Sequence, residues 1–206
     1  MKFIALLCLL LWLPSQQVWA QWDVSQIRTL GEECLLDTSI IDDSKLTLRF
    51  SRFASVLEQA AAQPRSVAAQ CSIEVSFTVP ARHKVVTLTH RAFAQVTKNA
   101  ASRVTMEVNL NLNEQAFAFS GRIPEGSALD QKVLLYKSFK PVDDLARCHE
   151  HETKISVILS WDLHAEAAAS GGRARLSLSG EELWTDSWIE TRPCDELAHA
   201  SALNDA

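Results

Sequence analysis

The stretch 103-RVTMEVNLNLN-113 has the longest strict alternation of apolar and polar residues in the chain. Apolar side chains occupy every second position from Val104 to Leu112, and Thr, Glu and Asn occupy the positions between them. Successive side chains of a β-strand point to opposite faces of a sheet, whereas those of a helix do not alternate in this way. The stretch is therefore predicted to form a strand with one buried face and one solvated face.

The same period of two appears on both sides of this stretch. Clear examples are residues 45–50, 72–79, 154–164 and 173–180, and weaker examples are residues 85–96, 116–121 and 133–139. Pro80 lacks an N–H group and is expected to end the strand that precedes it. Eight or more short strands predict an all-β domain, either an antiparallel β-sandwich or an open barrel. We favour the sandwich.

Two Ala-rich segments break the alternation. Residues 53–70 have a helix-favouring composition before Pro64 and are predicted to form a short helix or a loop inserted between strands. Residues 165–172 are predicted to form a helical turn or a hairpin tip that ends in two glycines. No linker divides the chain, so residues 21–194 are predicted to form one domain, followed by a flexible tail over residues 195–206.

The N-terminus has the three parts of a cleavable secretory signal. Lys2 supplies a positive charge, residues 3–13 are apolar, and small residues precede a predicted cleavage site after Ala20. The apolar run is much shorter than the roughly 20 residues of a transmembrane helix, and no later stretch is long and apolar enough to serve as one. The mature chain is therefore predicted to begin at Gln21, to have no transmembrane segment and to be secreted or periplasmic.

The charge balance of the chain is mildly acidic. The formal net charge is −5 at pH 7, and it becomes −6 once Lys2 is removed with the signal. Nucleic acids and anionic membrane surfaces attract clusters of Lys and Arg, and the sequence contains no basic run. Nucleic acid is therefore not expected as a partner.

The mature chain keeps four cysteines, because Cys8 is removed with the signal. An even number of cysteines in an exported protein predicts two disulfides. Four cysteines allow three pairings, among which the sequence alone does not choose. We favour Cys34–Cys71 with Cys148–Cys194, because each bond then fastens one end of the mature chain to the body and the two together clamp two facing β layers.

The most chemically suggestive motif is 148-CHEH-151. If this segment is extended, His149 and His151 project to the same face and could approach one metal ion together. A zinc site needs a third protein ligand, however, and the other histidines show no complementary spacing. The motif is therefore either part of a metal site, with His149 and His151 as two of the ligands, or a hydrated segment that leads from a disulfide-bonded cysteine into a strand. We favour the second interpretation.

Trp184 and Trp188 form a second candidate site. They are four residues apart, so they share a face in a strand and also in a helix. If exposed, the two indoles could stack on sugar rings, whose C–H faces suit aromatic platforms. If buried, they are core anchors, which is the interpretation we favour.

The common catalytic motifs do not occur in this sequence. There is no Gly-x-Ser-x-Gly elbow, no His-Glu-x-x-His zinc helix, no phosphate-binding glycine loop and no dinucleotide fingerprint. No catalytic residue and no cofactor is therefore predicted, although a dispersed pair of carboxylates would leave no local motif.

The order of cysteines and strands resembles that of a known family. The segments KLTLRFSRF, QCSIEVSFTVP, TLTHRAFAQV, RVTMEVNLNL and FAFSG, followed by two late cysteines with a Trp before the last, resemble the secreted domain of unknown function 4360. The resemblance covers roughly residues 34–194. It implies a small exported protein of bacteria or fungi with disulfides and mostly β structure, and we predict a bacterial origin. The family has no established activity, so the resemblance implies no catalytic residue. Glu33, Ala81 and Ala92 stand where that family tends to have glycine.

These observations together predict an exported, all-β sandwich with two disulfides that acts as a non-catalytic binding or cell-envelope interaction module, with a glycan or an envelope protein as partner. One alternative is a secreted hydrolase or metal-binding protein that uses His149 and His151. A second alternative is an inert structural component of the envelope. No reactive cluster in the sequence favours an enzyme, so the binding module is preferred.

Overall fold

A computed structural model describes residues 20–30, 34–42, 44–58, 65–113, 115–167 and 171–194 of the chain. The predicted tail over residues 195–206 and all of the predicted signal except Ala20 lie outside the described residues. In the part of the chain that is described, no helix combines the length and the apolar character that a membrane span requires.

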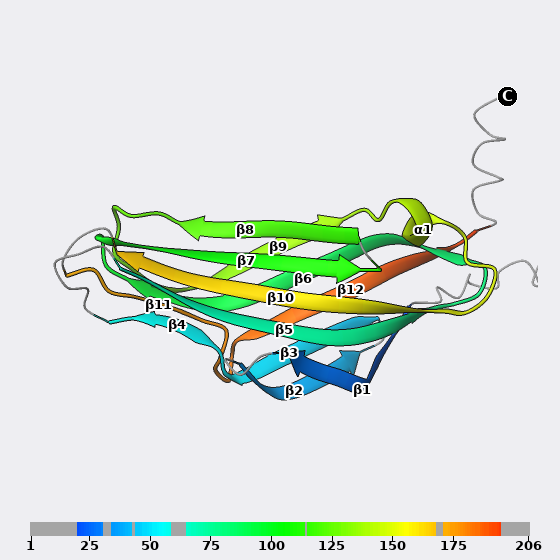
Figure 1. Cartoon of the computed structure of the whole chain (residues 1–206), viewed down its shortest axis with the longest axis horizontal. Coiled ribbons are helices and arrows are strands. Elements are labelled where there is room, and N and C mark those ends of the chain that lie inside the picture. The colour runs from blue at the N-terminus through cyan, green and yellow to red at the C-terminus, as the bar shows by residue number, and fades with distance from the viewer. Residues whose placement is uncertain are drawn as a thin grey trace, which may run out of the picture.

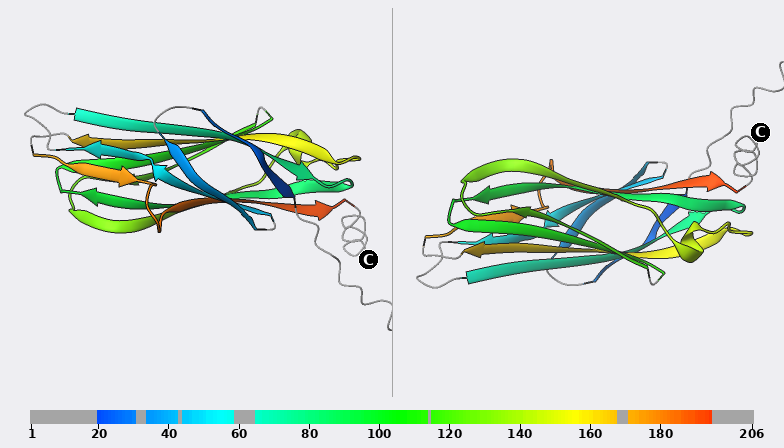
Figure 2. Two further views of the ribbon diagram at one scale, coloured as in Figure 1. Left: turned by 90° about the horizontal axis from the view of Figure 1, so that it is seen from below. Right: turned by 90° about the horizontal axis from the view of Figure 1, so that it is seen from above.

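The chain forms two antiparallel sheets packed face to face, as predicted (Figures 1 and 2). One sheet has five strands in the order β1 (Gln21–Leu30), β5 (Arg65–Val79), β10 (Thr153–Ala167), β7 (Ser102–Leu112) and β8 (Gln115–Ile123). The other has seven, of which six follow the order β2 (Leu35–Asp42), β3 (Lys45–Arg52), β12 (Trp184–Pro193), β6 (His83–Lys98), β11 (Ala174–Ser177) and β4 (Ala54–Leu57). The seventh strand, β9 (Leu129–Phe139), pairs with the free edge of β6.

The alternation seen in the sequence builds the core between the two sheets. β10 lies between β5 and β7, and its inward residues alternate with outward ones along its whole length. Trp161 on β10 is fully buried and packs edge-on against Phe50 of β3 in the opposite sheet. Every inward residue predicted for β7, from Val104 to Leu112, is buried as expected. β5 ends at Val79, directly before Pro80.

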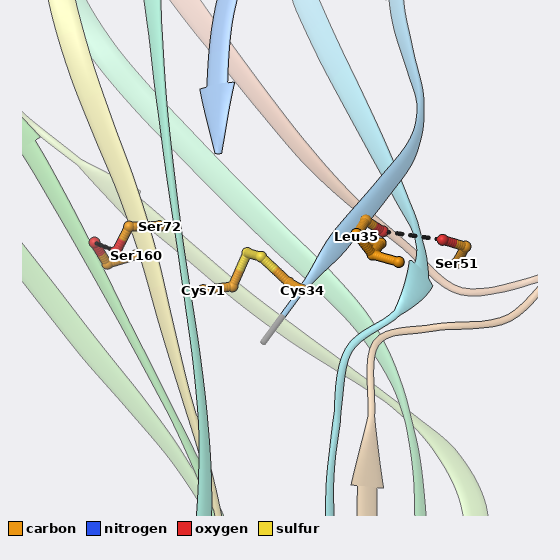
Figure 3. Close-up of a disulfide and its surroundings, with 6 residues drawn as sticks. All are labelled: Cys34, Leu35, Ser51, Cys71, Ser72 and Ser160. Atoms are coloured by element: carbon orange, nitrogen blue, oxygen red, sulfur yellow. Dashed lines mark hydrogen bonds between the residues drawn. A yellow bond between two sulfur atoms is a disulfide. The ribbon is translucent and has the colours of Figure 1, made fainter. Parts of the chain in front are cut away.

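Both disulfides follow the favoured pairing, and the first joins one sheet to the other. Cys34, directly before β2 of the seven-stranded sheet, bonds to Cys71 on β5 of the five-stranded sheet (Figure 3). Cys148, ahead of β10, bonds to Cys194, directly after β12. The bonds close loops with sequence separations of 37 and 46 residues, so each should stabilise the fold by up to about 4 kcal/mol in the chain-entropy model.

The two Ala-rich segments are mostly strand where they are described. Within residues 53–70, Ala54–Leu57 forms β4 and Arg65–Gln70 belongs to β5, while residues 59–64 lie outside the described part. Over the described residues of this segment the structure therefore has strands where a short helix or a loop was predicted, because both parts pair with neighbouring strands. The one helix among the described residues is α1 (Asp143–Ala146), which the sequence analysis did not predict.

Candidate functional site

The outer face of the seven-stranded sheet gathers aromatic side chains around β12. Alternation along β12 turns Trp184, Asp186 and Trp188 outward, while Ile189 points into the core. β12 is flanked by β3 and β6 over this stretch, and both indoles are half-buried. The predicted Trp pair is thus neither a core anchor nor fully exposed.

Arg91 of β6 lies between the two indoles. Its guanidinium carbon is 5.1 Å from the ring centroid of Trp184 and 4.7 Å from that of Trp188. Its Nη2 donates a 2.6 Å hydrogen bond to Asp186, whose other carboxylate oxygen accepts a 2.6 Å hydrogen bond from the Thr47 hydroxyl of β3. The Asp186 side chain is only 5% exposed, so this ion pair holds the Arg91 charge in place from beneath.

Further aromatic and cationic groups extend this arrangement on both sides. Phe93 of β6 lies opposite Trp184 with their ring centroids 5.6 Å apart, and Lys132 of β9 stands 6.0 Å from the Phe93 centroid. At the other end, Tyr136 of β9 lies 6.4 Å from Trp188. We call this row of four rings and two cations the aromatic ladder; its members are Lys132, Phe93, Trp184, Arg91, Trp188 and Tyr136.

Tyr136 is the most accessible ring of the aromatic ladder, with 58% of its surface exposed. Its hydroxyl is 2.9 Å from the Ser138 hydroxyl, which is in turn 2.8 Å from that of Thr89. Hydroxyl groups can donate and accept hydrogen bonds. This end of the aromatic ladder therefore combines an exposed ring with polar groups beside it.

Two grooves continue the surface beyond Lys132, at the other end of the aromatic ladder. The nearer has a volume of about 440 Å³ and is lined by Lys132, Gln95 and Glu182, among others. The second has a volume of about 690 Å³ and shares Thr97 and Arg175 with the first. Amide, hydroxyl, guanidinium and carboxylate groups line the two grooves.

Lys98 forms part of the wall of the larger groove without offering a free charge to it. Its Nζ donates hydrogen bonds to the backbone carbonyls of Ser127 at 2.6 Å, Ser102 at 3.0 Å and Asn99 at 3.4 Å. Burial lowers the pKa of Lys98, and the negative charge of Glu125 opposes this shift. The ammonium of Lys98 therefore links the turn over residues 99–102 to the segment that contains Ser127.

A buried histidine lies on the core side of β6, next to Arg91 in sequence. His90 is fully buried; its Nε2 accepts a 3.2 Å hydrogen bond from the Trp161 indole, so its Nδ1 carries the proton and donates to Ser187 at 2.8 Å. Burial lowers the pKa of His90 from 6.5 to about 3. This neutral imidazole joins β6 and β12 to the opposite sheet beneath the aromatic ladder.

The predicted His149 and His151 pair is not held in an extended strand. His149 forms an isolated bridge with His83, residues 150 and 151 lie in a bend, and β10 begins only at Thr153. His151 is exposed, and its carbonyl accepts a hydrogen bond from the Thr153 hydroxyl. Over the residues that the structure describes, no group of three or more His, Cys, Asp or Glu is placed to hold a metal ion.

Sequence reasoning found the two indoles but missed the residues that surround them. Arg91 and Asp186 are 95 residues apart, and Tyr136 comes from a third strand. The available signal was the alternation in 90-HRAFAQ-95, which places Arg91 and Phe93 on one face of their strand. That signal does not say which strand lies beside it.

No family model matches the chain, and no curated protein matches it. Among solved structures, the chain is similar to TmCBM61 in complex with beta-1,4-galactotriose, with 7% identity, coverage of 84% of this chain and 87% of that chain, and a TM-score of 0.27. It is also similar to the enzymatically active domain of tailspike protein 4 of bacteriophage CBA120, with 12% identity, coverage of 83% of this chain and 19% of that chain, and a TM-score of 0.23. Neither similarity bears on what this chain binds.

Proposed function

We propose that the protein is an exported carbohydrate-binding module whose binding surface is the outer face of the seven-stranded sheet. The observation that carries this proposal is the aromatic ladder, in which Trp184 and Trp188 flank Arg91 and the exposed Tyr136 continues the row. Single exposed apolar residues are common on proteins, but a row of rings with polar groups beside it is typical of a recognition surface.

The chemistry of the aromatic ladder suits a sugar ring. One face of a pyranose presents C–H groups that pack against an aromatic ring, while its hydroxyls need hydrogen-bond partners. Tyr136 and the half-buried Trp188 offer aromatic surface, and the hydroxyl of Ser138, which also bonds to the buried Thr89, lies close to Tyr136. The two indoles lie close together, because the guanidinium of Arg91 contacts both of them. One oligosaccharide could therefore contact both indoles.

The rigidity of the aromatic ladder also favours binding. Ordering a long side chain on binding costs roughly 0.5–1.5 kcal/mol. Here the ion pair to Asp186 and the cation–π contacts already hold Arg91 and the two indoles in place. The two grooves beyond Lys132 provide polar groups along which a longer chain can extend.

Export is proposed on two grounds. The N-terminal sequence has the layout of a cleavable signal, and the chain contains two disulfides, which is usual for proteins of oxidising compartments. A secreted or periplasmic location would bring the aromatic ladder into contact with glycans outside the cytoplasm. N-terminal sequencing of the exported protein should begin at Gln21, and retention of residues 1–20 would contradict this part of the proposal.

Glycan binding is tested with an array of neutral and acidic polysaccharides, followed by calorimetry on the best binder. Trp188→Ala should weaken binding by about 2 kcal/mol, or roughly 30-fold, because a Trp at the centre of an interface is typically worth this much. Tyr136→Ala should also weaken binding, and it is the safer variant for folding because this ring is 58% exposed.

The matched control is Asn109→Ala on the outer face of the five-stranded sheet, which should bind like the unmodified protein. Unchanged glycan binding in both aromatic variants would contradict the proposal. An array in which no glycan binds the protein would also contradict it. Circular dichroism of each variant separates a loss of binding from a loss of folding.

A further inference from the structure

Two histidines from distant parts of the chain meet at the end of the sandwich where β12 ends and β10 begins, on the right in Figure 1. His83 is the first residue of β6, and His149 pairs with it in an isolated antiparallel bridge. The His149 N–H donates a 3.0 Å hydrogen bond to the His83 carbonyl. Residues directly opposite each other in such a bridge have Cβ atoms roughly 4.5–5.5 Å apart and project to the same side.

The Nε2 atoms of both imidazoles are buried and have no hydrogen-bond partner. Buried polar atoms in proteins are nearly always paired, so an unpaired one calls for an explanation such as a bound ion. In this structure two such atoms belong to residues that lie opposite each other in one antiparallel bridge. This coincidence distinguishes the pair from a histidine that is buried alone in a core, such as His90.

The hydrogen bond of the His83 ring suits a metal ligand. Its Nδ1 is 2.9 Å from the backbone carbonyl of Ala81, and a carbonyl can only accept a hydrogen bond, so Nδ1 donates. This orientation assigns the metal-binding lone pair to Nε2. Metal-binding histidines in proteins are usually oriented in this way, with the second ring nitrogen donating to a carbonyl or carboxylate.

The backbone around the pair is fixed by covalent and hydrogen bonds. Cys148, next to His149, is bonded to Cys194, whose N–H donates a 2.9 Å hydrogen bond to the carbonyl of Arg82, next to His83. The Arg82 N–H in turn donates to the His149 carbonyl at 2.6 Å. The two histidines are thus held together before any ligand arrives, which lowers the cost of binding.

We propose that His83 and His149 bind a late first-row divalent metal ion through their Nε2 atoms. Imidazole ligands suit copper and nickel, and among divalent ions Cu²⁺ binds most tightly to a given set of nitrogen ligands. Zinc, which needs a third protein ligand, should bind more weakly. Because metal–nitrogen distances are about 2.0–2.1 Å, the two Nε2 atoms have to lie close together to bind one ion. Both Nε2 atoms are buried in the metal-free protein, so water has to enter with the ion to fill the remaining coordination positions. The site is separate from the aromatic ladder and does not depend on the proposed glycan binding.

The test is calorimetric titration of the mature protein with CuSO₄, NiCl₂ and ZnCl₂, with electron paramagnetic resonance of the Cu²⁺ complex. One equivalent of Cu²⁺ should bind, with hyperfine splitting from two imidazole nitrogens. His83→Gln and His149→Gln should each weaken binding by at least about tenfold and remove one nitrogen from the spectrum. His151→Gln is the matched control and should bind like the unmodified protein.

Three results would overturn the proposal. The first is that the unmodified protein binds Cu²⁺ no more tightly than the His83→Gln/His149→Gln double variant does. The double variant measures Cu²⁺ binding elsewhere on the chain. The second is an equal loss in His151→Gln, which would place the site on His149 and His151 instead. The third is a spectrum without nitrogen splitting. Thermal unfolding of each metal-free variant shows whether it is folded before titration.

Discussion

The outer faces of the two sheets have the same origin in strand alternation but opposite chemistry. Between β5, β10 and β7, the five-stranded sheet presents short polar and acidic side chains, such as Ser72 and Ser160, whose hydroxyls are 2.7 Å apart (Figure 3), and Asp162 opposite Glu107. All described Trp and Phe residues of that sheet are buried or packed against the core. The seven-stranded sheet instead carries the aromatic ladder on its outer face.

The difference shows that outward-facing residues of an alternating strand can either interact with water or pack against one another. On the five-stranded sheet, the outward residues interact mainly with water, and their exact identities should matter little to stability. On the seven-stranded sheet, outward residues from β12, β6 and β9 contact one another and half-bury each other. Substitutions at matched positions of the two faces can therefore measure how far they differ.

The largest effect is expected from Asp186→Ala. This substitution leaves the Arg91 charge without its buried partner and removes the acceptor of the Thr47 hydroxyl, so the free energy of unfolding should fall by about 3 kcal/mol. Asp162→Ala, on the outer face of the five-stranded sheet, should change it by about 0.5 kcal/mol or less. Urea unfolding of both variants measures the two values, and equal losses would show that the faces do not differ.

The next effect concerns His90 beneath the aromatic ladder. Its pKa is about 3 in the folded protein and near 6.5 in the unfolded chain, so the unfolded chain binds more protons between these pH values. The free energy of unfolding should therefore decrease as the pH falls below 6.5, by about 1.4 kcal/mol per pH unit. Between pH 6.5 and 5, where few carboxylates titrate, the loss should reach about 2 kcal/mol.

Denaturant unfolding at several pH values measures this slope. His90→Gln should flatten it, whereas His164→Gln, on the outer face of the five-stranded sheet, should keep it. A slope that is unchanged in His90→Gln would assign the pH dependence to other groups.

The smallest effect is expected for the ion pair between Arg103 and Glu166 on the outer face of the five-stranded sheet. Both side chains are more than a third exposed, at 40% and 34%. Exposed ion pairs contribute little because water and salt screen them, so Glu166→Gln should cost about 0.5 kcal/mol or less. A loss as large as that of Asp186→Ala, measured in the same urea series, would contradict the contrast between the two faces.

Much of the fold could be predicted because its signals are local. Alternation in residues 103–113 and 154–164 identified strands and their buried faces correctly, and the position of Pro80 gave the end of β5. β1 and β2 were not predicted, because their sequences do not alternate strictly. The Ala-rich composition of residues 53–70 suggested a helix, but pairing with neighbouring strands prevailed over helix propensity there.

The candidate sites were only half visible in the sequence, because each consists of residues from distant segments. Trp184 and Trp188 could be paired from their spacing alone, but Arg91 and Tyr136 could not be placed beside them. His149 was recognised as a candidate ligand, but the structure places His83 opposite it and leaves His151 exposed in a bend.

The sequence by itself determined which residues form many of the strands and which of their faces are buried, because side-chain alternation is a property of each strand alone. It also limited the cysteines to three possible pairings. Only the tertiary structure decided which strands lie side by side, and hence that one guanidinium lies between two indoles and that His83 meets His149. Strand register depends on contacts between segments far apart in the chain, and a single sequence does not record those contacts.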